Sequence, residues 1–307
     1  MSKKIIERIH KEANTADLLP LLTAMPSSDL TSLLMEVMRR KTEQLSPGDL
    51  FRNYTSNRFV KPADVDFVSF SAFQLGLLQK AQSVGFSPLE LSPVSPLGSC
   101  AAVATVNQDK ILSALRSTEV VADATNLLAL EAVTRRKQTF FDQNTIRLCT
   151  VHRHLRTPYV KLPFTAHFKI FCMVTAGKDT GSLLFEKQHL VEHIRFITDF
   201  LKSFPAVEAV KVVLKSTQKE NTSFASLRDT VMEEIKDVMF VKEEVEQPYY
   251  QIIQFKVFVT IAQKEVEIAD GGFVDWSQKL SNNRKERMLT SGIGIELLFK
   301  LLDLESL

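Results

Sequence analysis

The segment from Ile253 to Ile261 constrains the fold more than any other part of this 307-residue chain. Successive side chains of a β-strand point to opposite faces, so strict alternation marks a strand that has one face on a core. Here every second residue is apolar: Ile253, Phe255, Val257, Val259 and Ile261. Val266 to Ile268 follows at once and is predicted to pair with this strand. We therefore expect a sheet.

Further segments predict helices mixed with strands. Strands are expected at 146–151, 168–175 and 210–214, and helices at 65–84, 123–136, 186–204 and 295–302, with another opened by Ser226–Asp229. The helices do not alternate strictly with the strands, as they would in a parallel α/β fold. This pattern favours the α+β class, with a mostly antiparallel sheet flanked by helices.

The first 60 residues differ from the rest and predict a helical N-terminal extension. Apolar residues between Leu30 and Met38 recur at helical spacing, with Asp29 as the expected N-cap, and Ser46–Asp49 ends that helix. We accordingly divide the chain into an extension, 1–60, and a core, 61–307. Three prolines within 86–96 favour an extended edge segment at the start of the core.

Composition excludes several classes of protein. Thirty-eight basic residues oppose 36 acidic ones, so no molecule-wide field attracts nucleic acid, and nucleic-acid binding is not expected. No apolar run approaches the roughly 18 residues that span a bilayer, and the N-terminus lacks a signal sequence. Three scattered cysteines fit a reducing compartment. We predict a cytoplasmic protein with no membrane association.

A basic cluster runs from Arg147 to Lys161 without any acid. Guanidinium groups match phosphate and carboxylate, so this segment predicts a local anion site, although a solvated basic loop explains the composition equally well. The candidate anion ligands are Arg153, Arg156, Lys161 and His167.

Zinc is a weaker interpretation of the same region. Cys149 and Cys172 bracket three histidines, but alternation along the strand separates Cys149 from His152 and His154, and no Cys-x-x-Cys pair exists. We expect no metal site. The two cysteines are predicted to be buried small apolar residues rather than nucleophiles.

Glycine pairs mark two junctions. Gly271–Gly272 follows a predicted strand, and Gly292–Ile293–Gly294 precedes the final helix. Glycine permits either a positive φ or close approach of the backbone to a ligand or a strand. A tight turn and a packed junction remain equally good explanations.

Taken in order, these segments resemble the catalytic core of class II aminoacyl-tRNA synthetases, particularly the histidyl branch. Segment 85–93 is similar to the first motif, which forms the dimer interface; 152–158 with 167–171 resembles the second, which holds ATP; 292–298 resembles the third. The resemblance implies a homodimer and a cleft for ATP or another nucleotide, with Arg153 on the α-phosphate. The implied cleft-lining residues are Tyr249, Tyr250, Gly271, Gly272, Asp275, Gly292, Gly294 and Glu296.

Several charged positions of the family are lost. Leu155 replaces the second motif's acid, Leu297 replaces the third motif's arginine, and Val245 and Phe273–Val274 replace further residues of the histidyl branch. Removing one preorganised donor from a site of developing charge costs about 10²–10³ in rate, so synthetase activity is not expected. The chain ends at Leu307, which leaves no room for an anticodon-binding domain in this sequence.

The resemblance therefore implies a non-synthetase paralogue that binds a small anionic or amino-acid-like ligand. It is similar in this respect to the regulatory subunits of ATP phosphoribosyltransferase, which implies a heteromeric enzyme partner. Two alternatives stay open: a ligase or transferase that uses the degenerate cleft, and a protein that binds tRNA or another nucleic acid through the basic segment.

Overall fold

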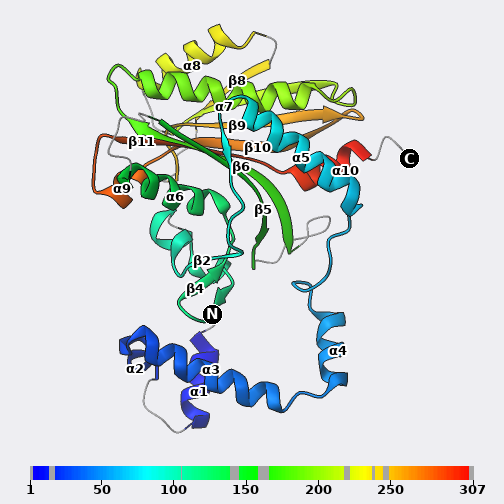
Figure 1. Cartoon of the computed structure of the whole chain (residues 1–307), viewed down its shortest axis with the longest axis vertical. Coiled ribbons are helices and arrows are strands. Elements are labelled where there is room, and N and C mark those ends of the chain that lie inside the picture. The colour runs from blue at the N-terminus through cyan, green and yellow to red at the C-terminus, as the bar shows by residue number, and fades with distance from the viewer. Residues whose placement is uncertain are drawn as a thin grey trace.

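A computed structural model describes residues 3–13, 18–104, 106–138, 145–157, 166–217, 222–236, 239–244 and 249–303. Its centre is a strongly curved sheet of eight strands in the order β1-β5-β6-β11-β10-β9-β7-β8 (Figure 1). The β1–β5 and β7–β8 pairs are parallel, and the five other pairs are antiparallel. The predicted α+β class with a mostly antiparallel sheet is confirmed.

The strands of this sheet are longer than the sequence pattern suggests. They are β1 (Ser87–Pro88), β5 (Thr145–Leu155), β6 (His167–Lys178), β7 (Ala209–Ser216), β8 (Met239–Glu244), β9 (Gln251–Ile261), β10 (Lys264–Val274) and β11 (Glu286–Ile293). Three short strands, β2 (Val94–Pro96), β3 (Ser113–Ala114) and β4 (Thr118–Val120), form a separate small sheet. The sequence analysis missed β8 and β11. The glycine pair after the predicted strand in fact lies inside β10, and Gly292 lies inside β11.

Helices cover both faces of the large sheet. The helices are α1 (Lys3–Ala13), α2 (Leu18–Ala24), α3 (Ser27–Glu43), α4 (Pro47–Ser56), α5 (Phe67–Ser83), α6 (Ala124–Gln138), α7 (Leu184–Lys202), α8 (Thr222–Glu234), α9 (Trp276–Ser281) and α10 (Ile295–Asp303). In Figure 1, α5, α7 and α10 lie on one side of the sheet, and α6 and α9 lie on the other. We call these sides the core face and the cleft face.

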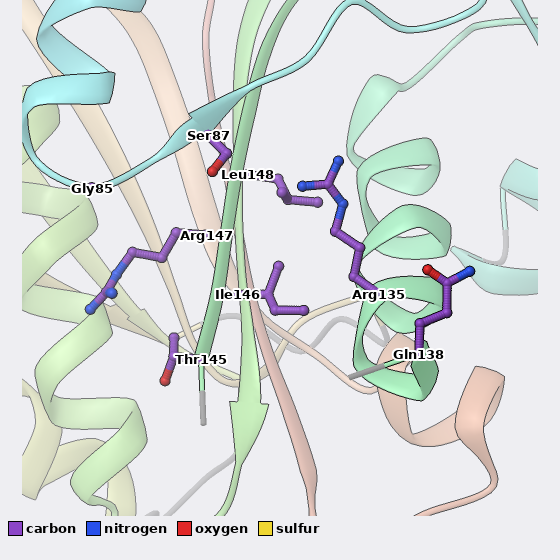
Figure 2. Close-up of a pocket in the computed structure, with 8 residues that line it drawn as sticks. All are labelled: Gly85, Ser87, Arg135, Gln138, Thr145, Ile146, Arg147 and Leu148. Carbon is purple, nitrogen blue, oxygen red and sulfur yellow. The ribbon is translucent and has the colours of Figure 1, made fainter. Parts of the chain in front are cut away.

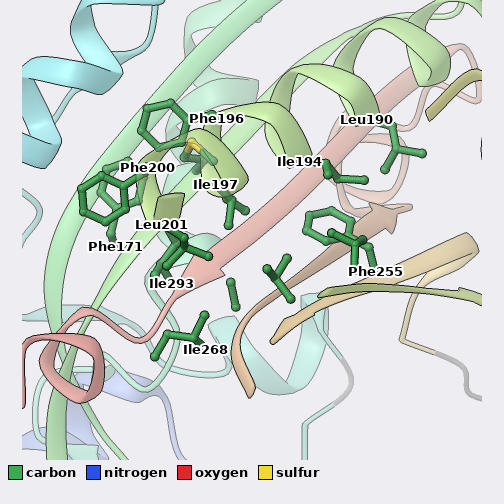
Figure 3. Packing of buried hydrophobic residues seen from close by; sticks show 14 of the residues in the cluster. Phe171, Leu190, Ile194, Phe196, Ile197, Phe200, Leu201, Phe255, Ile268 and Ile293 are labelled. Carbon is green, nitrogen blue, oxygen red and sulfur yellow. The ribbon is translucent and has the colours of Figure 1, made fainter. Parts of the chain in front are cut away.

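The core face carries the larger apolar cluster. Every second residue of β9, from Ile253 to Ile261, is at most 4% exposed, which confirms the predicted buried face. Phe171 of β6, Ile293 of β11 and Phe255 of β9 meet the α7 side chains Leu190, Ile194 and Leu201 there (Figure 3). Complete burial of a large apolar side chain contributes roughly 1.5–3 kcal/mol, so this layer holds the sheet in place.

The cleft face is only partly covered. Ile146, Leu148, Val174 and Met288 project from the sheet against α6, and Trp276 of α9 completes this second cluster. Beyond α6, the small sheet and the segment from Gly98 to Ile111 curve over the same face (Figure 1). The space between them and the strands contains the cleft described below.

Helices α1 to α4 lie below the sheet in Figure 1. The described residues of α2, α3 and α4 include no buried side chain. Two helix starts differ from prediction: Pro26 rather than Asp29 is the N-cap of α3, and α8 begins at Thr222, four residues before Ser226. Helix α3 ends at Glu43, and Ser46 is the N-cap of α4, where it forms a reciprocal capping box with Asp49. Among the described helices, none is both long enough and apolar enough to cross a bilayer.

Candidate ligand-binding cleft

Two adjoining cavities form one cleft on the cleft face, at the middle of the sheet. The outer cavity has a volume of about 580 Å³ and the inner one, against the strands, about 60 Å³. A volume of this size suits a ligand such as an amino acid or a nucleoside. Six residues line both cavities: Asp123, Arg156, Ile170, Tyr249, Tyr250 and Asp270.

Strand register brings the floor of the cleft together. Asp270 of β10 lies opposite Gly292 of β11, which in turn lies opposite Cys172 of β6. Residues in such a row share a face, so all three point to the cleft. Because Gly292 has no side chain, the row leaves room beside the Asp270 carboxyl, and a Cβ at Gly292 would lie 3.2 Å from Ile170.

Two partly buried carboxyls face this space. Tyr250 Oη donates a hydrogen bond to Asp270 Oδ2 at 3.2 Å, and Tyr249 Oη donates to Asp123 Oδ2 at 3.4 Å. Burial, together with the nearby negative charge of Asp123, raises the pKa of Asp270 from 3.8 to about 6. Among the described residues, neither carboxyl has a lysine or arginine within ion-pair distance. The pair is therefore suited to a cationic group of a ligand.

Asp123 is also fixed by the backbone at the start of α6. Its Oδ1 accepts hydrogen bonds from Thr125 N at 2.9 Å and Thr125 Oγ1 at 2.6 Å. This places the carboxyl as an N-terminal cap beside the positive end of the helix dipole. Only Oδ2 remains directed to Tyr249 and the cleft.

His154 supplies an uncharged donor. Burial lowers the pKa of His154 to about 3, so the ring is neutral near pH 7. Nε2 accepts the Ala124 N–H at 3.1 Å, which leaves the ring proton on Nδ1. That buried Nδ1 has no hydrogen-bond partner among the described residues, and His154 lines the inner cavity.

Arg156 stands at the opposite wall. Its Nε donates to Ala122 O at 3.1 Å, and its guanidinium lies 5.5 Å from the centre of the Phe168 ring. These contacts fix the base of the fork while the side chain still lines both cavities. Arg156 is thus placed to bind a carboxylate or another planar anion.

The remaining wall comes from Cys100 and Lys110, which lie between β2 and β3 in the sequence. Buried Glu119 of β4 accepts hydrogen bonds from Gly98 N at 2.8 Å and Cys100 N at 3.1 Å, which anchors the backbone around Cys100. Thr157 N donates to Lys110 O at 3.1 Å, which ties Lys110 to the residues after β5. Both residues line the outer cavity. The charged lining of the cleft is balanced, with Lys110 and Arg156 against Asp123 and Asp270.

The adjacent tyrosines depend on a glycine. A Cβ on Gly272 would lie 2.6 Å from Cδ1 of Tyr250 and 2.6 Å from the Ile253 carbonyl oxygen, so the Tyr250 ring rests directly on the Gly272 backbone. Tyr249 packs edge-on against Tyr250, with ring centroids 4.7 Å apart. Of the two roles that the sequence left open for these glycines, close approach is the one the structure uses, since neither has a positive φ.

The expected anion site is not assembled as predicted. Arg153 occupies an odd position of β5 and faces the core side, where Nη1 donates to Glu296 Oε2 at 3.1 Å. The Nδ1 of His167 lies 2.9 Å from Arg153 Nη1 on that same face. Arg156 therefore lies in the cleft without Arg153 or His167. Lys161 lies outside the described residues.

The cleft-lining residues that the resemblance implied do not all lie in the cleft. Tyr249, Tyr250 and Gly292 line the cleft, and Gly272 lies beneath Tyr250. Gly271 points to the core face, where its Cβ would lie 2.5 Å from Phe255 Cζ. The other three do not reach the cleft: Asp275 pairs with Lys279 at 2.9 Å, Gly294 N bonds to Ile268 O, and Glu296 is buried beneath Arg153.

Asp123, Asp270, His154 and Lys110 are cleft residues that the sequence analysis did not select. Alternation already placed His154 on the face opposite Cys149, and the structure agrees. The same alternation places Arg156 on the face of His154 and Arg153 on the opposite face. The positions of His154 and Arg156 could therefore be predicted from the sequence, whereas those of Asp123 and Lys110 depend on tertiary contacts.

A separate cavity of about 520 Å³ lies at the edge of the sheet (Figure 2). In Figure 2, Ile146, Leu148 and Arg135 lie between β5 and α6, whereas Arg147 points the other way. Both arginines already have acidic partners, because Arg135 pairs with Glu131 and Arg147 pairs with Glu192, each at 2.7 Å. The lining of this cavity includes no carboxyl group, in contrast to the cleft.

The fold is similar to that of class II aminoacyl-tRNA synthetase cores. An apo histidyl-tRNA synthetase from S. aureus superimposes with a TM-score of 0.61 at 13% identity, covering 80% of this chain and 70% of that one. An ATP phosphoribosyltransferase regulatory subunit/histidyl-tRNA synthetase from Bacillus halodurans gives 0.62 at 12% identity, covering 79% and 81%. A threonyl-tRNA synthetase structure from Cryptosporidium parvum gives 0.63 at 7%, covering 76% and 64%.

Sequence comparison adds no closer relationship. No protein-family model matches this sequence, and no curated protein matches it. The structural comparisons therefore confirm the expected histidyl-synthetase-like fold. At such low sequence identities they show the fold alone.

The described lining of the cleft has no excess of positive charge that would favour a nucleoside triphosphate. The described lining holds two cations against two carboxyls, and its histidine is neutral. Where the resemblance implied an arginine on the α-phosphate, β5 presents His152 and His154 to the cleft face instead. The charged groups that line the cleft suit a ligand that carries both a positive and a negative charge.

Proposed function

We propose that this protein is a non-synthetase relative of the class II core that binds a small zwitterionic, amino-acid-like ligand and acts as a binding or regulatory subunit. The observation that carries the proposal is the pair of partly buried carboxyls, Asp123 and Asp270, that face one cleft together with Arg156. A partly buried carboxylate without a nearby cation loses part of its hydration, and a bound ammonium group offsets that cost.

Each end of the ligand has its own partners. The ammonium group lies between Asp123 and Asp270, where it lowers the raised pKa of Asp270. The carboxylate reaches the fork of Arg156 and the Nδ1–H of His154, both of which are donors. Tyr249 and Tyr250 form the aromatic wall and exclude water.

Amino-acid activation is not part of this proposal. Adenylate formation develops negative charge on phosphate, and such charge needs preorganised cationic donors. On β5 the cleft face offers a neutral histidine, and the arginine at position 153 is committed to Glu296 on the other face. Among the structural neighbours, the Bacillus halodurans protein carries a regulatory-subunit name, which supports a regulatory role.

A ligand screen tests the proposal. The twenty amino acids, AMP and ATP are each added to the purified chain, and the melting temperature is measured. We expect one or a few amino acids to stabilise the protein, since a ligand at 100 times its Kd adds about 2.7 kcal/mol. Asp270→Asn, which keeps the shape of the carboxyl, removes that stabilisation. Stabilisation by ATP alone would contradict the proposal.

Pyrophosphate exchange separates the proposal from the enzyme alternative. The stabilising amino acid is incubated with ATP and labelled pyrophosphate, and label entering ATP is counted. We expect no exchange above a sample without protein. Amino-acid-dependent exchange would show activation chemistry and would overturn the non-synthetase assignment.

We further propose that the chain forms a homodimer through α5 and the sheet edge. Strand β1 covers only Leu148 and Cys149 of the 11-residue β5. On the neighbouring α5, Phe67 is 71% exposed and Val68 77% exposed, which is unusual for large apolar side chains. Strand β1 lies within segment 85–93, which resembles the first motif.

Light scattering coupled to size exclusion measures the assembly state. We expect a mass of twice 34.7 kDa for the wild type. Val68→Glu is expected to give monomers, because it places a charge in the apolar contact. Met232→Glu, at an exposed position of α8, is the matched control and is expected to keep the dimer. A wild type that is monomeric at micromolar concentration would refute the dimer.

A further inference from the structure

A second cavity, of about 210 Å³, lies at the other end of β10 and β11 and shares no residue with the cleft. It forms where these strands meet the first turn of α7 and the helix α9. Five lining residues are apolar and four carry polar groups: Leu183, Ile252, Phe273, Val274, Met288, Glu186, Gln251, Gln278 and Arg287.

Glu186 is the unusual member of this lining. It is 2% exposed, and its Oε1 accepts the Arg287 Nε–H at 2.8 Å. Its second oxygen, Oε2, has no hydrogen-bond partner among the described residues. An unsatisfied buried acceptor is costly, so a site that keeps one favours an external donor.

The local charge favours a cation. Arg287 is shared between two acids, since its Nη2 also donates to Asp179 Oδ2 at 2.6 Å. Glu186, Asp179 and Arg287 therefore sum to one negative charge. The third guanidinium nitrogen of Arg287, Nη1, donates to the carbonyl oxygens of Arg284 and Glu286. Four of the five guanidinium N–H groups of Arg287 are therefore engaged by acceptors other than Oε2.

Backbone strain gathers at the same cavity. Leu183 and Ile252 both adopt left-handed backbone conformations, with φ of 57° and 58°. For a β-branched residue such as Ile252, this backbone conformation is a strained outlier. Ile252 sits in a bulge, where the register between β9 and β10 jumps from Gly272–Gln254 to Phe273–Gln251. Such strain persists where the surrounding structure holds a site in shape.

We propose that this cavity is a second binding site, for a small primary amine with a compact apolar body. The ammonium group donates to Glu186 Oε2, and the body packs against Phe273, Val274 and Met288. A dry cavity of about 150 Å³ accepts benzene, so 210 Å³ accommodates an aromatic ring with one short aminoalkyl arm.

Matched probes test the site. Benzylamine and benzyl alcohol have the same size, and only the amine is a cation near pH 7. We expect benzylamine to raise the melting temperature saturably and benzyl alcohol to bind at least tenfold more weakly. Glu186→Gln removes the difference between the probes. Asp270→Asn keeps it, which separates this site from the cleft. Equal effects of the two probes, or a benzylamine effect that survives Glu186→Gln, would overturn the proposal.

A crystal of the wild-type chain soaked with 4-bromobenzylamine gives an answer even if Glu186→Gln does not fold. The anomalous signal of bromine locates the probe directly. We expect bromine inside the cavity and the nitrogen within hydrogen-bond distance of the Glu186 carboxylate. Bromine elsewhere, or no ordered bromine at saturating concentration, would refute the site.

Discussion

The two faces of the large sheet are made from alternate residues of the same strands, yet they differ in chemistry. The core face packs Phe171, Phe255 and Ile293 against α7 in the larger apolar cluster. The cleft face places Asp270, Gly292 and Cys172 in one row and leaves space above them. Alternate residues of each strand therefore serve different roles, one set in the core and the other in the cleft.

This division explains why neighbouring residues have unrelated roles. Arg153 and His154 are adjacent, but Arg153 binds Glu296 on the core face whereas His154 lines the cleft. Gly271 and Gly272 are also adjacent, and each makes room for an aromatic ring on its own face. A change at one position is expected to affect one property far more than the other.

The largest expected effect is on the free energy of unfolding. Substitution of one isoleucine on each face of the sheet tests it. Ile293→Ala removes a fully buried core-face side chain, and we expect a loss of about 3–5 kcal/mol in the free energy of unfolding. Ile170→Ala, the matched change on the cleft face, removes a half-buried side chain and costs about 1–2 kcal/mol. Urea denaturation measures both. Equal losses would show that the faces do not differ as described.

Asp270→Asn is expected to stabilise the protein by about 2–3 kcal/mol at pH 7 while it removes ligand binding. The folded pKa of about 6 exceeds the unfolded 3.8, so the folded state binds more protons between these values. The carboxyl therefore lowers stability as pH rises from about 4 to about 6, and the penalty is complete above that.

Urea denaturation of wild type and Asp270→Asn across pH 4–8 measures this difference. We expect the advantage of the variant to grow with pH up to about 6 and then to level off. A difference that stays constant with pH would mean that Asp270 does not titrate as the structure indicates.

The adjacent glycines sharpen the comparison further. A Cβ at either position lies within 2.6 Å of a backbone carbonyl oxygen, so Gly271→Ala and Gly272→Ala should each cost about 1–3 kcal/mol. Only Gly272→Ala displaces Tyr250, and we expect it alone to weaken ligand binding by more than tenfold. Calorimetric titration below the melting temperature checks this; equal weakening by both would contradict the assignment.

Gly76→Ala is expected to have the smallest effect on stability, and it should raise stability where the other glycine substitutions lower it. Gly76 lies in the middle of α5, and a Cβ there meets nothing within 4 Å. Replacing it with alanine should stabilise the protein by about 1 kcal/mol without any change in ligand affinity. Destabilisation would indicate that α5 is packed more closely than the structure shows, for instance by a second subunit.

Much of the architecture could be predicted from local patterns. The alternation from Ile253 to Ile261 identified a strand with its buried face, and the order of motifs indicated the class II core. The β8 strand was missed because Glu243 and Glu244 resemble a solvated acidic loop, whereas parallel pairing with β7 places them in the sheet. The β11 strand was missed because its glycine suggested a helix junction.

The cleft could be predicted only in part. Tyr249, Tyr250, Gly292 and Arg156 were recognised, but Arg153 was placed in the cleft by matching a motif without counting which face it occupies. Asp123 could not be found by local pattern, because it reaches the site only when α6 packs on β5 and β6. The division at residue 60, the homodimer and the ligand itself stay predictions.

One matched pair of variants tests the central claim most directly. The amino acid that stabilises the wild type is titrated calorimetrically into Arg156→Ala and Arg153→Ala, which remove the same charge from opposite faces of the sheet. We predict that Arg156→Ala weakens binding at least tenfold and that Arg153→Ala leaves the Kd within about twofold, since losing a charged hydrogen bond costs about 1.5–3 kcal/mol. Loss of binding in Arg153→Ala with retention in Arg156→Ala would contradict the account.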